Sequence, residues 1–316
     1  MTIGITGPER RAPGRNAVVG IIIAAIVVGI FLILLGLTGD VLVDWLWFSS
    51  IGYLQVFLTT FGTKAAVFFS VLVATAIVLL LNGFLAASFA RRQWTQHPAA
   101  WQRPGIATLP NPFGFMRHRL SWPRVIASGA GLLAILVAAG EVRNWDLFLR
   151  FFYQVPYGAN DPVYIKDIGF YLFSLPAYIV IKNWMLLALS LSAFFAAAIY
   201  WVHGDIEYNA QQRSMSPTAI AHGSVLLGFF FAVKAWSYGL DRYLLLYGDN
   251  GVVVGASYTD IHVELPVLWL LIGLSAVAAF AAWANLRLRT QWLPAAAAVL
   301  VFGGSFLLSG LVPAMF

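Results

Sequence analysis

Residues that ligate metal ions recur at every second position of one short segment, at Asp260, His262 and Glu264. On a β-strand these three side chains would share a face, because alternate residues of a strand point the same way. Two carboxylates and an imidazole suit a divalent cation. The same alternation is also typical of the water-facing side of a surface strand. We favour this second interpretation and keep metal binding as the alternative.

Two lysines, Lys182 and Lys234, lie inside long apolar stretches, each about five residues from the end of its stretch. Together they could line a path for an anionic ligand or a lipid headgroup. The simpler interpretation, which we favour, is that each side chain extends along apolar surroundings to a membrane boundary. No Asp or Glu occurs within these stretches. This argues against transport coupled to protons or sodium, and less against a lipid path.

Other signatures of catalysis are missing from the sequence. There is no cysteine, which excludes disulfides, thiolate nucleophiles and cysteine-based metal sites. No pair of histidines has metalloprotease spacing, no glycine-rich phosphate loop precedes a helix, and no nucleophile elbow occurs. We therefore assign no catalytic residue and expect no cofactor.

The composition indicates what kind of scaffold positions these residues. Of the 316 residues, 60% are hydrophobic and only 10% are charged, whereas soluble domains carry about 25% charged residues. So few charges could not cover a water-facing surface, which points to an integral membrane protein. The net charge of +6 does not indicate nucleic acid binding, because most basic residues lie in a few segments between apolar stretches, as expected beside anionic lipid.

The arrangement of apolar stretches predicts an all-α membrane protein with about seven spans, since a spanning helix needs about 20 apolar residues. A tail at 1–17 would precede a membrane domain at 18–316. The predicted spans are Val18–Thr38, Ala65–Phe89, Val125–Gly140, Ala177–Trp201, Ala219–Tyr238, Val267–Ala284 and Pro294–Val312. Residues 120–123 can extend the third span, which is the shortest.

The basic residues predict an orientation. Between Arg91 and Arg124 there are six arginines and no acidic residue, and short basic loops stay on the cytoplasmic side. With this loop inside, the N-terminus lies inside and the C-terminus outside. Inside segments then hold twelve Lys and Arg residues and outside segments hold five.

The predicted outer loops are rich in aromatic residues, which favour the boundary between membrane and water. Asn144 can cap a short helix over Trp145–Tyr153, with Trp145, Phe148 and Phe152 on one face. Together with Tyr157 these residues form a predicted docking surface. Further along, an Asn-Gly pair lies between the runs 243–247 and 252–254, which predicts an outer β-hairpin.

Three stretches resemble the uncharacterised protein family UPF0182, which comprises multi-pass membrane proteins of bacteria. They are Asp44–Thr59 (DWLWFSSIGYLQVFLT), Asp161–Pro176 (DPVYIKDIGFYLFSLP) and Leu240–Pro266 (LDRYLLLYGDNGVVVGASYTDIHVELP). The resemblance implies a seven-helix N-terminal membrane region in the plasma membrane, followed by a large extracytoplasmic domain. This sequence stops at Phe316, so we expect either a fragment or a short member. The resemblance carries over no catalytic residue.

Three functions are consistent with these observations. The first, which we favour, is a non-enzymatic membrane scaffold or anchor whose outer face docks an extracytoplasmic domain or protein partner in envelope assembly or maintenance. The second is a transporter or lipid-handling protein that uses Lys182 and Lys234. The last is a membrane enzyme that uses Asp260, His262 and Glu264. Membrane lipids are expected partners in each case, and nucleic acid is not.

Overall fold

The computed structural model describes residues 24, 28, 29, 36, 38–96, 121–203, 205–208, 213–248 and 255–307. Its contacts divide the chain into two units, Met1–Gly62 and Thr63–Phe316. In the first unit, residues 38–50 are helical and a turn with Gly52 at φ +79° leads into α2 (Leu54–Gln96), which continues into the second unit. In this first part of α2, the rings of Phe57 and Phe61 stack on each other, with centroids 5.8 Å apart.

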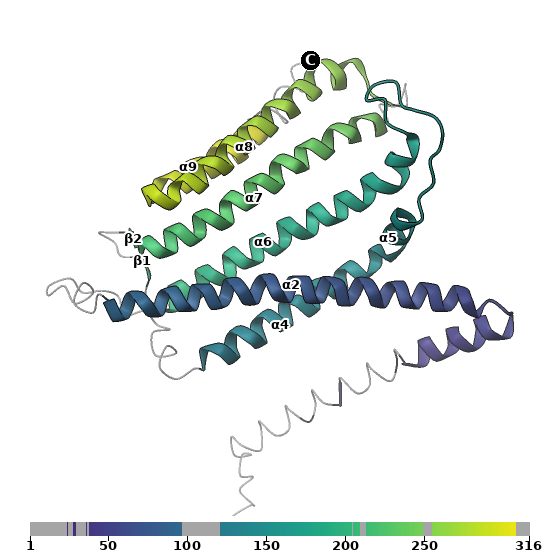
Figure 1. Ribbon diagram of the computed structural model, residues 1–316, viewed down its shortest axis with the longest axis horizontal. Helices are drawn as coiled ribbons and strands as arrows, with labels where there is room; N and C mark the ends of the chain where they lie inside the picture. Colours follow the sequence, from purple (N-terminus) through teal and green to yellow (C-terminus); the bar gives the residue numbers. More distant parts are fainter. Residues whose placement is uncertain are drawn as a thin grey trace, which may run out of the picture. The chain divides into compact units, whose positions relative to one another are not determined.

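The second unit is a set of packed helices (Figure 1). After α2 come α4 (Trp122–Glu141), a 3-10 turn η1 (Val142–Asn144), α5 (Trp145–Phe152), a π-helical turn η2 (Phe170–Ser174), α6 (Leu175–His203), α7 (Pro217–Leu244), a 3-10 turn η3 (Leu245–Tyr247), a π-helical turn η4 (Asp260–Glu264), α8 (Leu265–Leu288) and α9 (Trp292–Phe306). Consecutive long helices pack side by side, α6 on α7, α7 on α8 and α8 on α9. The order of packing therefore follows the order of the chain.

Five helical stretches in the described part of the chain are long and apolar enough to cross a membrane: Leu54–Arg91, Trp122–Phe152, Phe170–His203, Pro217–Tyr247 and Asp260–Leu288. They contain the second to sixth predicted spans. The predicted seventh span corresponds to α9, which is shorter at 15 residues, and its last residues lie outside the described residues. The first span, Val18–Thr38, also lies almost wholly outside them. A mainly helical fold is thus confirmed, whereas seven spans and their orientation stay predictions.

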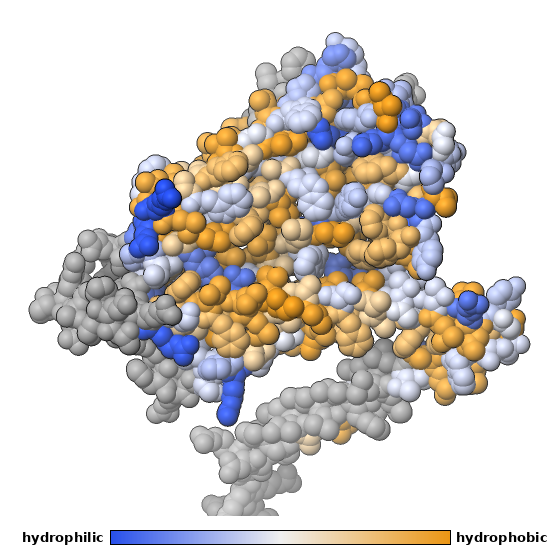
Figure 2. Space-filling model, viewed as in Figure 1, coloured by the Kyte–Doolittle hydropathy of each residue, from blue (hydrophilic) through white to orange (hydrophobic). Residues whose placement is uncertain are grey.

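Small residues let the helices approach closely. Ala86 and Ala90 on α2 are fully buried in a cluster with residues of α4, α6 and α7, and Ala130 and Ala134 on α4 are also fully buried. A Cβ atom at Gly228 on α7 would collide with the indole of Trp283 on α8, so that close approach requires glycine. Large apolar side chains face outward instead, and they cover much of the face in Figure 2. Apolar atoms outside and small ones between helices are what a bilayer favours.

Polar side chains join the helices at the end where α6 finishes and α7 begins. Tyr200 on α6 hydrogen-bonds His222 Nδ1 on α7 (3.0 Å), and His222 Nε2 lies 3.2 Å from Asn82 Oδ1 on α2. Between α6 and α7 the chain forms a short antiparallel pair, β1 (Ile206–Tyr208) with β2 (Arg213–Met215). Sequence reasoning missed this pair.

The predicted outer hairpin is not confirmed. Its first arm, Tyr243–Tyr247, is helical, because α7 continues to Leu244 and η3 follows. Tyr243 and Leu246 pack against Tyr171 and Leu175, so helical packing decides the conformation of this segment over its β propensity. The turn and the second arm, 249–254, lie outside the described residues.

Candidate functional site

The loop between α5 and η2, residues 153–169, folds around the carboxylate of Asp161. The backbone N–H groups of Val163 and Tyr164 donate to Asp161 Oδ1 (2.8 and 2.6 Å), and that of Lys166 donates to Oδ2 (2.8 Å). The Tyr171 hydroxyl also donates to Oδ2 (2.8 Å). One side chain thus satisfies three backbone donors in a loop without regular structure, as an Asx-turn does.

A second carboxylate, Asp167, organises the other side of the same loop. Tyr157 N and Gly169 N donate to Oδ1 (3.0 and 2.6 Å), and Gly158 N donates to Oδ2 (2.9 Å). Gly169 has no room for a side chain, since a Cβ atom there would lie 2.7 Å from Asp167 Oδ1 and 3.1 Å from the carbonyl oxygen of Val155. The loop therefore has a defined backbone conformation.

Both carboxylates are held in the ionised form. Burial acts to raise the pKa of Asp161, but the hydrogen bonds from Tyr164, Lys166, Tyr171 and Val163 outweigh it, and the pKa lies below its usual 3.8. The backbone N–H groups of Tyr157 and Gly158 lower the pKa of Asp167 in the same way. The loop conformation consequently depends on two negative charges.

The loop is fixed to the end of α7. The Tyr164 hydroxyl donates to the carbonyl oxygen of Arg242 (2.9 Å), and the Tyr247 hydroxyl donates to that of Tyr171 (2.7 Å). The rings pack edge to face or tilted at centroid distances of 5.0–6.4 Å. We call this group the aromatic cluster, and it consists of Tyr164, Phe170, Tyr171, Tyr178, Tyr243 and Tyr247. It joins the loop, η2, α6, α7 and η3 into one structure.

Above this fixed base, several apolar side chains remain exposed. The exposed fractions are 76% for Phe152, 63% for Tyr157 and 74% for Ile165. Ile165 also has φ 54°, which is strained for a β-branched residue. We call this surface the outer platform, after the predicted orientation of the chain, and it consists of Phe152, Tyr153, Val155, Tyr157 and Ile165. A rigid backbone here carries apolar groups that nothing in the described part of the chain buries.

The sequence profile of the uncharacterised protein family UPF0182 matches residues 21–316. The chain belongs to this family. It is 68% identical over its full length to a UPF0182 protein from Bradyrhizobium diazoefficiens, of which it covers 34%. It is 49% identical over 97% of its length to one from Cupriavidus necator, of which it covers 33%. The chain therefore spans about a third of the length of these relatives, as expected for an N-terminal region. No solved structure matches it.

Two of the three stretches that resemble the UPF0182 family meet at the aromatic cluster. Asp161–Pro176 supplies Tyr164, Phe170 and Tyr171, and Leu240–Pro266 supplies Tyr243 and Tyr247. The third, Asp44–Thr59, lies in the first unit. The sequence alone could not reveal the two carboxylates that hold the loop, because their partners are backbone groups.

The predicted docking residues divide into two pairs. The short helix is confirmed as α5. Phe152 and Tyr157 belong to the outer platform, while Trp145 and Phe148 are half-buried. The ammonium group of Lys64 lies over the ring of Trp145, 5.6 Å from the ring centroid.

Each of the two lysines has a partner within the UPF0182 chain. Lys182 is buried on α6, and its Nζ lies 3.6 Å from Oδ1 of Asp241 on α7. Lys234 lies over the ring of Tyr238, 4.4 Å from its centroid. Lys182 thus has a protein counter-ion that the sequence did not reveal, because the pair depends on the register between two helices.

The metal candidates lie in η4, so the predicted strand is wrong at this position. In this π-helical turn Asp260, His262 and Glu264 do not share the face that a strand would give them. Asp260 Oδ2 accepts a hydrogen bond from Ser257 N (2.7 Å), and Asp260 N donates to Ser257 Oγ (3.2 Å), which is a reciprocal cap of the helix start. The described residues hold no group of three or more His, Asp or Glu side chains arranged for a metal ion.

Proposed function

We propose that this UPF0182 chain spans the bacterial plasma membrane and carries, on its outer side, a docking surface for a protein domain outside the membrane. The docking surface is the outer platform. The five long apolar helices and the excess of basic residues in the predicted inner segments support the membrane placement. The proposal includes seven spans, with the N-terminus inside and the C-terminus outside.

The observation that carries this proposal is the combination of a fixed loop with exposed apolar side chains. Exposed aromatic residues on helices such as α6 are accounted for by lipid. Tyr157 and Ile165 instead lie on a loop in which Asp161 and Asp167 accept hydrogen bonds from backbone N–H groups, and Phe152 ends α5 immediately before that loop. Rigid aromatic anchors lose little entropy on binding, and such residues dominate protein interfaces.

The occupant that best fits is a folded domain, either of the same polypeptide or of a separate protein. The curated relatives are about three times as long as the matched region, so the longer UPF0182 proteins contain further chain that could rest on this surface. The membrane region would then act as a scaffold or anchor in envelope assembly or maintenance.

The contact between Lys182 and Asp241 favours this scaffold over an anion transporter. An ammonium group that already has a carboxylate partner attracts a further anion weakly. Lys182 therefore supports the packing of α6 on α7 more readily than it supports passage of a ligand.

Photo-crosslinking tests the proposal in cells that express the protein from its own promoter. A photoreactive phenylalanine replaces Phe152 or Tyr157, and a matched control replaces Phe194, which is 78% exposed on α6. We expect crosslinks to polypeptide from the two platform positions, either within a longer UPF0182 chain or to a second protein. Crosslinks to lipid alone from Phe152, Tyr157 and Phe194 would contradict docking.

A further inference from the structure

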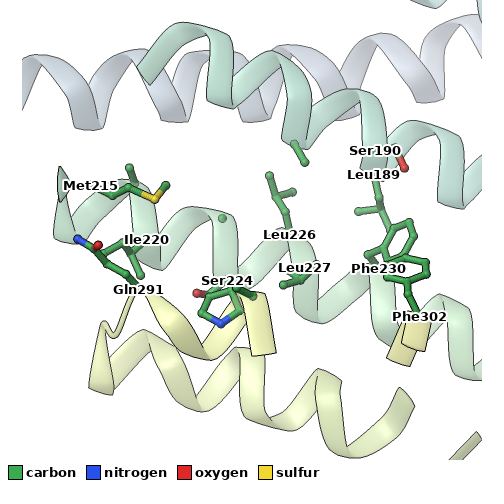
Figure 3. A pocket seen from close by; sticks show the side chains of 15 residues that line it. Leu189, Ser190, Met215, Ile220, Ser224, Leu226, Leu227, Phe230, Gln291 and Phe302 are labelled. Carbon is green, nitrogen blue, oxygen red and sulfur yellow. The ribbon is translucent and has the colours of Figure 1, made fainter. Parts of the chain in front are cut away.

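An elongated cavity of about 490 Å³ lies where α6, α7 and α9 come together. Figure 3 shows Met215 and Gln291 at one end of it and Phe230 and Phe302 at the other. Its lining on α7 runs from Ala219 to Phe230, which corresponds to a length of roughly 17 Å at 1.5 Å per residue. The cavity lies far along α7 from the outer platform, because Met215 precedes α7 whereas Arg242 and Tyr247 lie at its opposite end.

The lining selects for hydrocarbon. Most of the lining side chains are apolar, for example Leu189, Leu226, Leu227 and Phe230, and few polar atoms face the cavity. Ser224 already accepts a hydrogen bond from Asn285 Nδ2 (2.9 Å). A cavity of this volume falls in the range of about 300–1,000 Å³ that small-molecule sites occupy, but its lining offers few partners for a polar ligand.

Two charged residues lie close in the chain to Gln291, which marks one end of the cavity. Arg287 and Arg289 are exposed and precede Gln291 by four and two residues. The turn that holds them is fixed by Asn285, whose Oδ1 accepts from Thr290 N (2.9 Å) and whose Nδ2 donates to the carbonyl oxygen of Thr290 (3.0 Å). Two exposed arginines within four residues of Gln291, at one end of an apolar cavity, complement an amphiphile with a negative headgroup.

We infer that this cavity binds one acyl chain of an anionic phospholipid from the cytoplasmic leaflet, with the phosphate near Arg287 and Arg289. The inference rests on the membrane placement proposed above, and it is independent of the outer platform. The cytoplasmic leaflet supplies anionic lipids, and basic residues at the membrane boundary attract them. The apolar chain fills the space beside α7, and the arginines determine which headgroup is retained.

Native mass spectrometry of the full chain, delipidated in detergent and titrated with phosphatidylglycerol or phosphatidylcholine of identical acyl chains, tests this inference. We expect one phosphatidylglycerol to bind before any further lipid, and phosphatidylcholine to bind more weakly. Gly223→Leu places a side chain in the cavity, where a Cβ atom meets nothing within 4 Å, and we expect it to weaken binding by roughly tenfold or more. Gly273→Leu is the matched control, because Gly273 on α8 is equally open and does not line the cavity.

A charge variant supplies a second measurement. Arg287→Gln with Arg289→Gln should weaken phosphatidylglycerol binding by roughly tenfold and leave phosphatidylcholine binding unchanged. The matched control is Arg143→Gln with Arg150→Gln, which removes two exposed arginines that do not line the cavity. This control should leave the binding of both lipids unchanged. Equal binding of both lipids to the wild type, or unchanged binding to Gly223→Leu, overturns the inference. Loss of a dimer mass in Gly223→Leu would show that a second copy of the chain occupies the cavity instead.

The two proposals fail separately. If the platform positions crosslink only to lipid but phosphatidylglycerol still binds as expected, docking is wrong and the lipid site stands. If the platform crosslinks to polypeptide but Gly223→Leu binds lipid normally, the lipid site is wrong and docking stands.

Discussion

Lys182 on α6 and Asp241 on α7 form an ion pair, with 3.6 Å between Nζ and Oδ1. The side chain of Lys182 is 11% exposed and that of Asp241 is 31% exposed, so water screens only part of the interaction. The Ser237 hydroxyl donates to the other carboxylate oxygen of Asp241 at 3.5 Å. The pair joins the two helices just below the aromatic cluster.

Removing one partner of this pair should destabilise the protein. Lys182→Met leaves Asp241 without its counter-ion, and we expect a loss of about 1–3 kcal/mol, between the values for exposed and buried pairs. Thermal unfolding in detergent, followed by circular dichroism, measures the loss. Lys182→Met combined with Asp241→Leu should recover much of the stability. If the double variant is no more stable than Lys182→Met, the two residues do not act as a pair.

Acidification should loosen the outer loop. The pKa values of Asp161 and Asp167 are lowered from 3.8 by hydrogen bonds that favour the ionised form. A lowered pKa contributes stability that is fully present above pH 3.8 and is lost as the pH falls through the folded-state values. Hydrogen exchange of the backbone amides of residues 157–169, measured between pH 2.5 and pH 6 and corrected for intrinsic rates, should show protection decreasing below about pH 4.

Asp161→Asn should remove part of that pH dependence and reduce protection at neutral pH, because an amide accepts the same N–H bonds less strongly. Asp146→Asn is the control, since Asp146 pairs with Arg150 on the surface of α5 and holds no loop backbone. Equal protection in wild type and Asp161→Asn at pH 6 would show that the carboxylate does not organise the loop.

Gly169→Ala should disturb the outer platform without unfolding the helices. The added methyl group meets Asp167 Oδ1 and the Val155 carbonyl oxygen, and such overpacking costs about 1–3 kcal/mol. Gly140→Ala on α4 is the control, because its Cβ meets nothing within 4 Å. Limited proteolysis should cleave residues 153–169 faster in Gly169→Ala only, and the photo-crosslinks from Tyr157 should decrease in parallel.

His222→Leu should destabilise the contact between α2, α6 and α7. It removes the partner of the buried Tyr200 hydroxyl and of Asn82, which costs about 1–3 kcal/mol for a buried polar group left unsatisfied. His262→Leu is the control, since His262 is exposed on η4. A melting temperature for His222→Leu no lower than that of His262→Leu would show that the junction contributes little.

The sequence predicted what depends on local pattern. Apolar runs of about 20 residues located five of the described helices, and aromatic residues at helical spacing located α5. The predicted cap is wrong, because the Asn144 side chain makes no cap hydrogen bond and donates to Glu141 Oε2 instead. The runs around the Asn-Gly pair suggested a hairpin, but Tyr243 and Leu246 pack as part of a helical end. A β-like local pattern could not reveal that the partner surface was Tyr171 and Leu175.

The candidate site was predictable only in part, because its interactions join distant residues. Phe152 and Tyr157 were identified by their type and by the loop that contains them. The roles of Asp161, Asp167 and Asp241 depend on which backbone groups and which helix they face, and no spacing along one chain contains that information. The apolar cavity could not be predicted for the same reason, since it exists only where three helices come together.

The bonds that fix the outer loop have a consequence for biogenesis. Tyr164 donates to a carbonyl group 78 residues later in the chain, and Tyr171 accepts from a hydroxyl 76 residues later. During translation the loop therefore leaves the ribosome well before the end of α7 exists. A partner that docks on this loop, as we propose, would therefore meet its finished shape only after both α6 and α7 have formed.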